Sequence, residues 1–77
     1  MNRVRIRYCI SGNYLPRATR VAALIKQESG MDADLEPGGR GELSVWVDGK
    51  KVADKTMRGF PADADLLKNV KDALAAS

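Results

Sequence analysis

The chain has 77 residues, a net charge of +3, 44% hydrophobic residues and 30% charged residues, a composition of the soluble globular class rather than the disordered one. A chain this short buries only about 60 to 65% of its extended surface, so we expect residues 1–77 to form one domain with a single shallow core. Because histidine is absent, Ser-His-Asp catalysis, Cys-His catalysis and histidine-containing metal sites are all excluded.

The first predicted strand covers residues 3–8, where basic and apolar residues alternate. Val4, Ile6 and Tyr8 share one face and three arginines share the other, which is the pattern of a half-buried strand. Cys9 follows the strand directly and has the parity of the arginines.

Helical spacing replaces this alternation over residues 14–28. The apolar positions at that spacing are Leu15, Ala18, Val21, Ala22 and Ile25. Asn13 is predicted to cap the helix, Pro16 suits its first turn, and Gly30 is expected to end it.

Alternation returns over residues 32–36, with the acids pointing outward and the apolar residues, including Leu35, predicted to face the core. Residues 37–41 are interpreted as a turn, because their glycines lack the Lys-Ser/Thr of a phosphate-binding loop and open no helix. The clearest strand covers residues 42–47, in which Trp46 faces away from the apolar neighbours.

Asp48-Gly49 predicts a hairpin that returns the chain along residues 50–55 as an antiparallel strand. Asp63 is predicted to cap a final helix. Its inner positions are Leu66, Leu67, Val70, Ala73 and Leu74. The resulting β-α-β-β-β-α order predicts an α/β (α+β) fold of the minimal thioredoxin-like type, a four-stranded mixed sheet with both helices on one face.

The two parts of the chain differ in charge. Residues 1–27 hold six bases and no acid, whereas residues 28–77 hold ten acids and seven bases. This asymmetry indicates either an anionic partner for the basic part or mutual neutralisation of the two parts after folding.

The uncovered face of the predicted sheet carries Arg5, Arg7 and Trp46. Asp34 and Glu36 of the adjacent strand are expected to face the two arginines, each exposed pair contributing about 0.2 to 1 kcal/mol. An exposed tryptophan is commonest at interfaces, so this face is a candidate docking surface for a protein partner or a second copy of the chain. A single aromatic residue beside several carboxylates argues against nucleic-acid binding.

Cysteine usage indicates where the protein works. One cysteine can form neither an internal disulfide nor, by itself, a zinc site, so the chain suits a reducing compartment. Residues 1–7 lack the apolar run of a signal peptide or membrane span. We therefore expect a cytoplasmic protein that has no membrane segment and needs neither a metal nor a cofactor.

Cys9 is the first candidate for chemistry. An unperturbed thiol with a pKa of about 8.5 is roughly 3% thiolate at pH 7, but a helix N-terminus and nearby arginines lower the pKa. Arg17 and Arg20, one helical turn apart, could attract an anionic thiol such as glutathione or form an ordinary solvated face. The alternative for Cys9 is a small buried hydrophobe that ends a strand.

Residues 8–18, Tyr-Cys-Ile-Ser-Gly-Asn-Tyr-Leu-Pro-Arg-Ala, resemble the opening of the selenoprotein W-like (Rdx, SelT/SelW/SelH) family, Tyr-Cys-x-x-Cys/Sec-x-Tyr followed by a helix that often starts Pro-Arg-Ala. Residues 41–49 resemble its Gly-x-Phe-Glu-Val-x-Val-x-Gly segment, and Lys55 and residues 59–61 match its later Ser-Lys and Gly-x-Phe-Pro positions. The resemblance implies a thioredoxin-like fold and a redox role.

The chain departs from that family's motif at one position. Cys9 matches the first cysteine, but Gly12 stands where the motif has its second cysteine or selenocysteine. Without a second thiol, no internal group can resolve a mixed disulfide. Ser11 is two residues from Cys9 and does not reproduce the Cys-x-x-Ser arrangement of monothiol glutaredoxins.

Two hypotheses from different classes follow. In the first, Cys9 forms mixed disulfides with glutathione or a protein thiol, the loop residues Ile10, Ser11 and Gly12 support the sulfur, and glutathione is a co-substrate; whether enzymatic turnover survives is open. In the second, the chain is a non-catalytic interaction module that docks through its open sheet face.

Overall fold

In the computed structural model, which describes residues 2–76, the chain forms four strands and two helices. The elements are β1 (Val4–Tyr8), α1 (Tyr14–Ser29), β2 (Ala33–Pro37), β3 (Leu43–Val47), β4 (Lys50–Asp54) and α2 (Asp63–Ala76). Every element begins within one residue of the start predicted from the sequence. No helix of residues 2–76 is both long enough and apolar enough to cross a bilayer.

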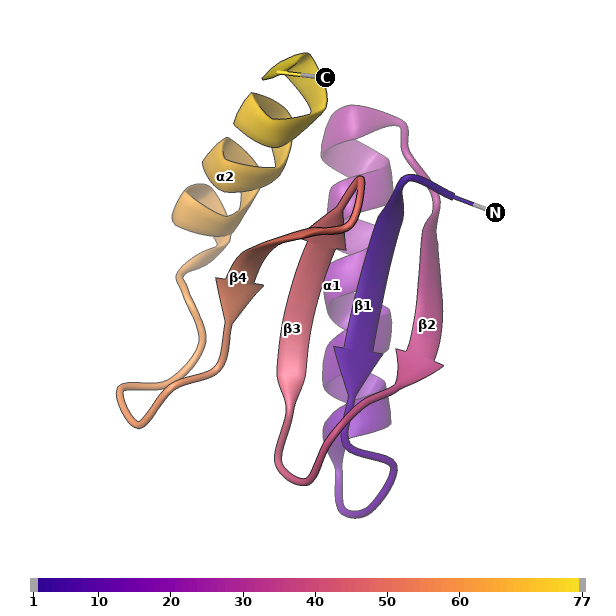
Figure 1. Ribbon diagram of the computed structural model, residues 1–77, viewed down its shortest axis with the longest axis vertical. Coiled ribbons are helices and arrows are strands. Elements are labelled where there is room, and N and C mark those ends of the chain that lie inside the picture. The colour runs from indigo at the N-terminus through magenta and orange to yellow at the C-terminus, as the bar shows by residue number, and fades with distance from the viewer. Residues whose placement is uncertain (1, 77) are drawn as a thin grey trace.

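The sheet has the strand order β2-β1-β3-β4 (Figure 1). β1 pairs in parallel with β2 and antiparallel with β3, and β3 pairs antiparallel with β4. Helix α1 connects the two parallel strands, and both helices pack on the same side of the sheet. This is the predicted thioredoxin-like arrangement, with one face of the sheet covered and the other open.

A single core lies between the sheet and the two helices. It consists of Val4, Ile6, Ala18, Val21, Ile25, Leu43, Val45, Val47, Ala53, Leu66 and Val70. Two residues predicted to face the core are instead exposed, Leu15 at 49% and Leu35 at 38%. Leu35 lies on the edge strand β2, and Leu15 lies in the first turn of α1, so neither is enclosed by neighbours on every side.

The predicted helix ends are only partly confirmed. Gly30 ends α1 in the left-handed conformation, with φ of 75°, and its N–H donates to the carbonyl of Lys26 at 2.9 Å. Asn13 occupies the N-cap position without a side-chain capping bond, because its φ of −101° and ψ of 32° depart from the extended geometry that such a bond needs. Asp63, the predicted cap, is instead the first residue of α2, and its carboxylate accepts hydrogen bonds from Arg20 of α1.

Folding neutralises most of the charge asymmetry between the two parts of the chain. Five of the six bases in residues 1–27 pair with acids from the second part. The pairs are Arg3–Asp48, Arg5–Glu36, Arg7–Glu42, Arg20–Asp63 and Lys26–Asp32. Of the two alternatives that the sequence leaves open, mutual neutralisation therefore accounts for five of these six charges, and Arg17 pairs with no acid of residues 2–76.

Ile6 and Leu35 are paired neighbours on β1 and β2 but differ in burial, which makes them a matched test of the core. We expect Ile6→Ala to lower the free energy of unfolding by about 2–5 kcal/mol, because Ile6 is fully buried. Leu35→Ala should cost about 1 kcal/mol or less. Urea denaturation followed by circular dichroism measures both, and equal losses would contradict the placement of the core.

Candidate functional site

Three connections meet at one end of the sheet, together with the N-terminus of α1 (Figure 1). They are the loops β1–α1, β2–β3 and β4–α2. Two backbone hydrogen bonds join the first two loops: the N–H of Cys9 donates to the carbonyl of Glu42, and the N–H of Gly38 donates to the carbonyl of Tyr8, both at 2.8 Å. The β2–β3 loop is therefore fixed directly beside Cys9.

Cys9 is a free thiol with only 6% of its surface exposed. The thiol is therefore buried, as in the alternative that the sequence offers for Cys9, and is not held in solvent. The cause is the β2–β3 loop, which hydrogen-bonds alongside Cys9. The residues that follow Cys9 in the β1–α1 loop, Ile10 to Asn13, are all exposed, so the thiol lies just beneath an open surface.

Hydrogen-bond donors surround the Cys9 sulfur and lower the pKa of the thiol. The largest contribution comes from the Ser11 hydroxyl, whose Oγ lies 3.2 Å from Sγ. Backbone N–H groups of Gly41 and Ser11 add to it, and the positive charge of Arg40 contributes last. Burial opposes these effects because it disfavours the charged form, but the donors outweigh it.

The residues that the sequence predicted around Cys9 have different surroundings in the structure. Ser11 contacts the sulfur as expected, whereas Ile10 is 73% exposed to solvent. Gly12 adopts φ of 78° and contributes no donor to the thiol, so its role is to turn the loop. Arg20 is occupied by Asp63 on α2. Arg17 lies over the Tyr14 ring, with its guanidinium carbon 5.5 Å from the ring centroid.

Sequence reasoning missed Arg40 and Gly41, which it assigned only to a turn. Gly41 has φ of 68°, a left-handed conformation that glycine adopts without strain. A signal was available: a strand that pairs antiparallel with β1 must start beside the residue that follows β1. The turn before Leu43 had therefore to lie against Cys9.

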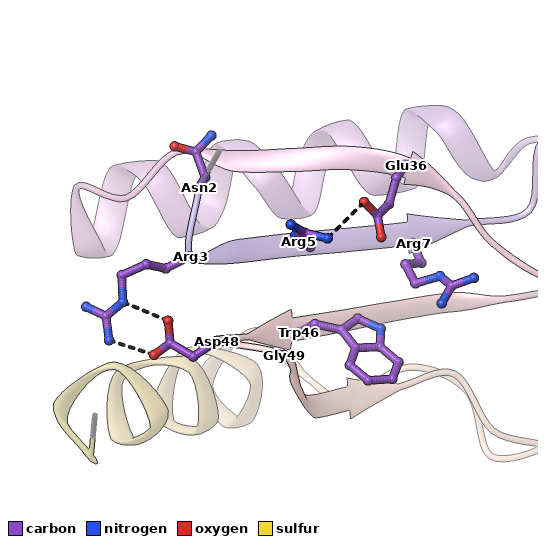
Figure 2. A pocket seen from close by; sticks show the side chains of 8 residues that line it. All are labelled: Asn2, Arg3, Arg5, Arg7, Glu36, Trp46, Asp48 and Gly49. Atoms are coloured by element: carbon purple, nitrogen blue, oxygen red, sulfur yellow. Dashed lines mark hydrogen bonds and ion pairs between the residues drawn. The ribbon is translucent and has the colours of Figure 1, made fainter.

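The open face of the sheet holds a groove of about 500 Å³ lined by Arg5, Arg7 and Trp46 (Figure 2). The predicted cross-strand register is confirmed, since Arg5 lies opposite Asp34 and Arg7 opposite Glu36. The ion pairs do not join the residues that lie opposite each other. Arg5 pairs with its diagonal neighbour Glu36 at 3.7 Å, and the Asp34 carboxylate accepts hydrogen bonds from Asn2.

A chain of hydrogen bonds connects this groove to the β2–β3 loop. Trp46 Nε1 donates to Ser44 Oγ at 2.9 Å, and the fully buried Ser44 hydroxyl donates to Glu42 Oε2 at 2.5 Å. The other oxygen of Glu42 accepts from the Gly39 N–H at 2.6 Å. These donors, with Arg7 adding a smaller effect, lower the pKa of Glu42 and keep it ionised.

The family is decided by a match over nearly the whole chain, since residues 3–72 match the Rdx family. The chain belongs to the Rdx family. This confirms the resemblance drawn from residues 8–18 and from the later strand and turn segments. No curated protein matches the sequence significantly.

Solved structures support the fold of this Rdx-family chain. It is similar to a selenoprotein W-related protein from Vibrio cholerae, with a TM-score of 0.78, 20% identity, and coverage of 90% of this chain and 91% of the other. A protein from Bordetella parapertussis matches with the same TM-score at 26% identity, covering 90% of this chain and 92% of its own. The fold is thus shared over about nine-tenths of each of these chains.

The Ser11 hydroxyl is the first cause of the lowered Cys9 pKa, so its removal has a predictable sign. We expect Ser11→Ala to raise the pKa and to move the midpoint of iodoacetamide alkylation to higher pH, because only the thiolate reacts. Asn13→Ala is the control, since Asn13 lies in the same loop and makes no side-chain capping bond. Identical pH profiles for the wild type and Ser11→Ala would refute this account of the site.

Proposed function

We propose that this Rdx-family chain is a one-cysteine thiol protein in which Cys9 forms reversible mixed disulfides with glutathione or with a cysteine of a partner protein. The observation that carries the proposal is the set of hydrogen-bond donors around Sγ from Ser11 and Gly41, to which the positive charge of Arg40 adds. They favour the thiolate, and the thiolate is the form that attacks a disulfide. A buried cysteine that serves only for packing needs no such donors.

The proposed reaction is thiol–disulfide exchange. The Cys9 thiolate attacks one sulfur of oxidised glutathione, a new S–S bond forms, and the second sulfur leaves as a thiolate that takes up a proton from water. Gly12 occupies the position of the second cysteine or selenocysteine in the motif that residues 8–18 resemble. Release therefore requires a second, external thiol, which attacks the mixed disulfide and regenerates Cys9.

Burial sets the condition for access. The β2–β3 loop is tied to Cys9 by a backbone hydrogen bond, whereas residues 10–13 are exposed on the other side. The disulfide therefore approaches from the β1–α1 loop, which must shift to expose Sγ. The hydrogen-bond donors around Sγ raise the fraction of thiolate, while the burial of Cys9 slows the approach of a disulfide. We therefore expect a selective reaction rather than a fast one.

The direct test is adduct formation with oxidised glutathione at neutral pH, followed by intact mass spectrometry and peptide mapping. We expect one glutathionyl group per chain, attached to Cys9 and removed by dithiothreitol. Cys9→Ser should show no adduct and should keep its circular dichroism spectrum. An unmodified thiol after prolonged incubation, in a protein that remains folded, would overturn the proposal.

A second candidate function is favoured by the groove on the open face. Trp46 lies in that groove of about 500 Å³ with its Nε1 bound to Ser44, so the ring is held in place beside Arg5 and Arg7. Immobilised aromatic and arginine side chains are typical of protein interfaces. Those two arginines are already balanced by Glu36 and Glu42, which favours a protein surface over a nucleic acid.

If the open face docks a second copy of the chain, Trp46→Ala should weaken self-association by about tenfold or more, the loss typical of a central interface aromatic. Sedimentation equilibrium over a range of protein concentrations measures the association constant. Met57→Ala is the control, because Met57 is fully exposed and lies outside the groove. A wild-type protein that stays monomeric throughout would exclude this form of docking.

A further inference from the structure

Three positively charged side chains lie at the Cys9 end of the sheet without an acidic partner among residues 2–76. Arg17, Arg40 and Lys55 take part in no ion pair among the described residues 2–76, whereas the other arginines of residues 1–27 (Arg3, Arg5, Arg7 and Arg20) are all paired with acids. Three free positive charges at one end of a small domain create a local attraction for anions.

Two of these cations lie over one aromatic ring. Arg17 lies 5.5 Å and Lys55 lies 5.9 Å from the centroid of the Tyr14 ring. The Tyr14 hydroxyl reaches toward the β2–β3 loop, because a Cβ built on Gly41 would lie 3.9 Å from it. Gly41 and Arg40 in turn contribute to the environment of the Cys9 thiol. Arg17 and Lys55 therefore lie near the part of the β2–β3 loop that borders Cys9.

The acids at this end are already engaged. Glu42 accepts hydrogen bonds from Gly39 and Ser44 and pairs with Arg7, and Asp54 pairs with Lys51. Neither carboxylate is within ion-pair distance of Arg17, Arg40 or Lys55 in the part of the chain that the structure describes. A carboxylate of a bound molecule could therefore pair with these three cations without displacing an acid of the chain.

Exposed apolar side chains lie on the same end. Ile10, next to Cys9, is 73% exposed, and Leu15 in the first turn of α1 is 49% exposed. We call Ile10, Tyr14, Leu15, Arg17, Arg40 and Lys55 the loop-end surface. Glutathione supplies carboxylates but little apolar area, whereas a protein segment supplies both.

We propose that the loop-end surface recognises an acidic protein segment that carries a cysteine next to an apolar residue, and that this segment is the disulfide partner of Cys9. The inference rests on the proposed thiol function and specifies its partner. Carboxylates of the segment would pair with Arg17, Arg40 and Lys55, and its apolar side chain would cover Ile10 and Leu15. The segment's cysteine enters as a disulfide. The Cys9 thiolate attacks its sulfur, an S–S bond to Cys9 Sγ forms, the segment's original S–S bond breaks, and the sulfur on the far side of that bond leaves as a thiolate.

The test uses two short peptides of equal length, each with one cysteine beside a leucine, one flanked by glutamates and the other by lysines. Each is supplied as its mixed disulfide with thionitrobenzoate, whose release reports the rate of reaction with Cys9. Rates are divided by the rate with the neutral hydroxyethyl disulfide, which removes effects on thiol pKa. At low salt we expect the acidic peptide to react about tenfold faster or more than the basic one, and the ratio to fall as salt is added.

Variants locate the effect. Arg17→Gln/Lys55→Gln should bring the ratio of acidic to basic rates close to one, whereas Lys50→Gln/Lys71→Gln should not, although both double variants remove the same charge. Lys50 and Lys71 are exposed and take part in no ion pair among residues 2–76, so they are matched controls. Ile10→Ser should slow both peptides relative to the neutral disulfide.

The outcomes separate the two proposals. Equal rates for the two peptides, with normal reaction of the neutral disulfide, would refute the acidic partner and leave the thiol function intact. No reaction with any disulfide, in a folded protein, would refute both. Binding of a fluorescent single-stranded oligonucleotide that is lost in Arg17→Gln/Lys55→Gln, without a preference between the peptides, would assign the surface to nucleic acid instead.

Discussion

The two-faced character of β1 is the constraint on which the rest of the structure depends. Val4 and Ile6 are completely buried, while Arg5 and Arg7 of the same strand lie on the open face. A shift of one residue would place the arginines in the core, where unpaired charges cost several kcal/mol each. This single register fixes the pairing with both neighbouring strands and brings Glu42 beside Cys9.

Most of the fold was predictable because each element has a clear period. Alternation in β1 and β3, helical spacing in α1 and α2, and the Asp48-Gly49 hairpin determine the order of elements and the pairing of Arg5 with Asp34. Periodicity does not say which strand lies at an edge, so the exposure of Leu35 was missed. Nor does register determine ion pairs, because a long arginine side chain reaches diagonal neighbours as easily as opposite ones.

The candidate site was predictable only in part. Cys9 and Ser11 are close in sequence, and their contact follows from a short loop after a strand. Arg40 and Gly41 are remote in sequence, and they influence the sulfur only because β3 pairs with β1 and brings their loop beside Cys9. The burial of Cys9 has the same origin, since the covering loop belongs to another part of the chain. Contacts that depend on tertiary pairing leave no local pattern.

The two edge strands of the sheet affect how copies of the protein associate in concentrated solution. β2, at one edge, carries Asp34 and Glu36 and finishes in Pro37, while β4, at the other edge, begins with Lys50 and Lys51. Proline and charged side chains on outer strands hinder the addition of a strand from another molecule. Two copies that approach by the same edge bring like charges together. These charges oppose the growth of the four-stranded sheet by edge-to-edge pairing, which is how fibrous aggregates form.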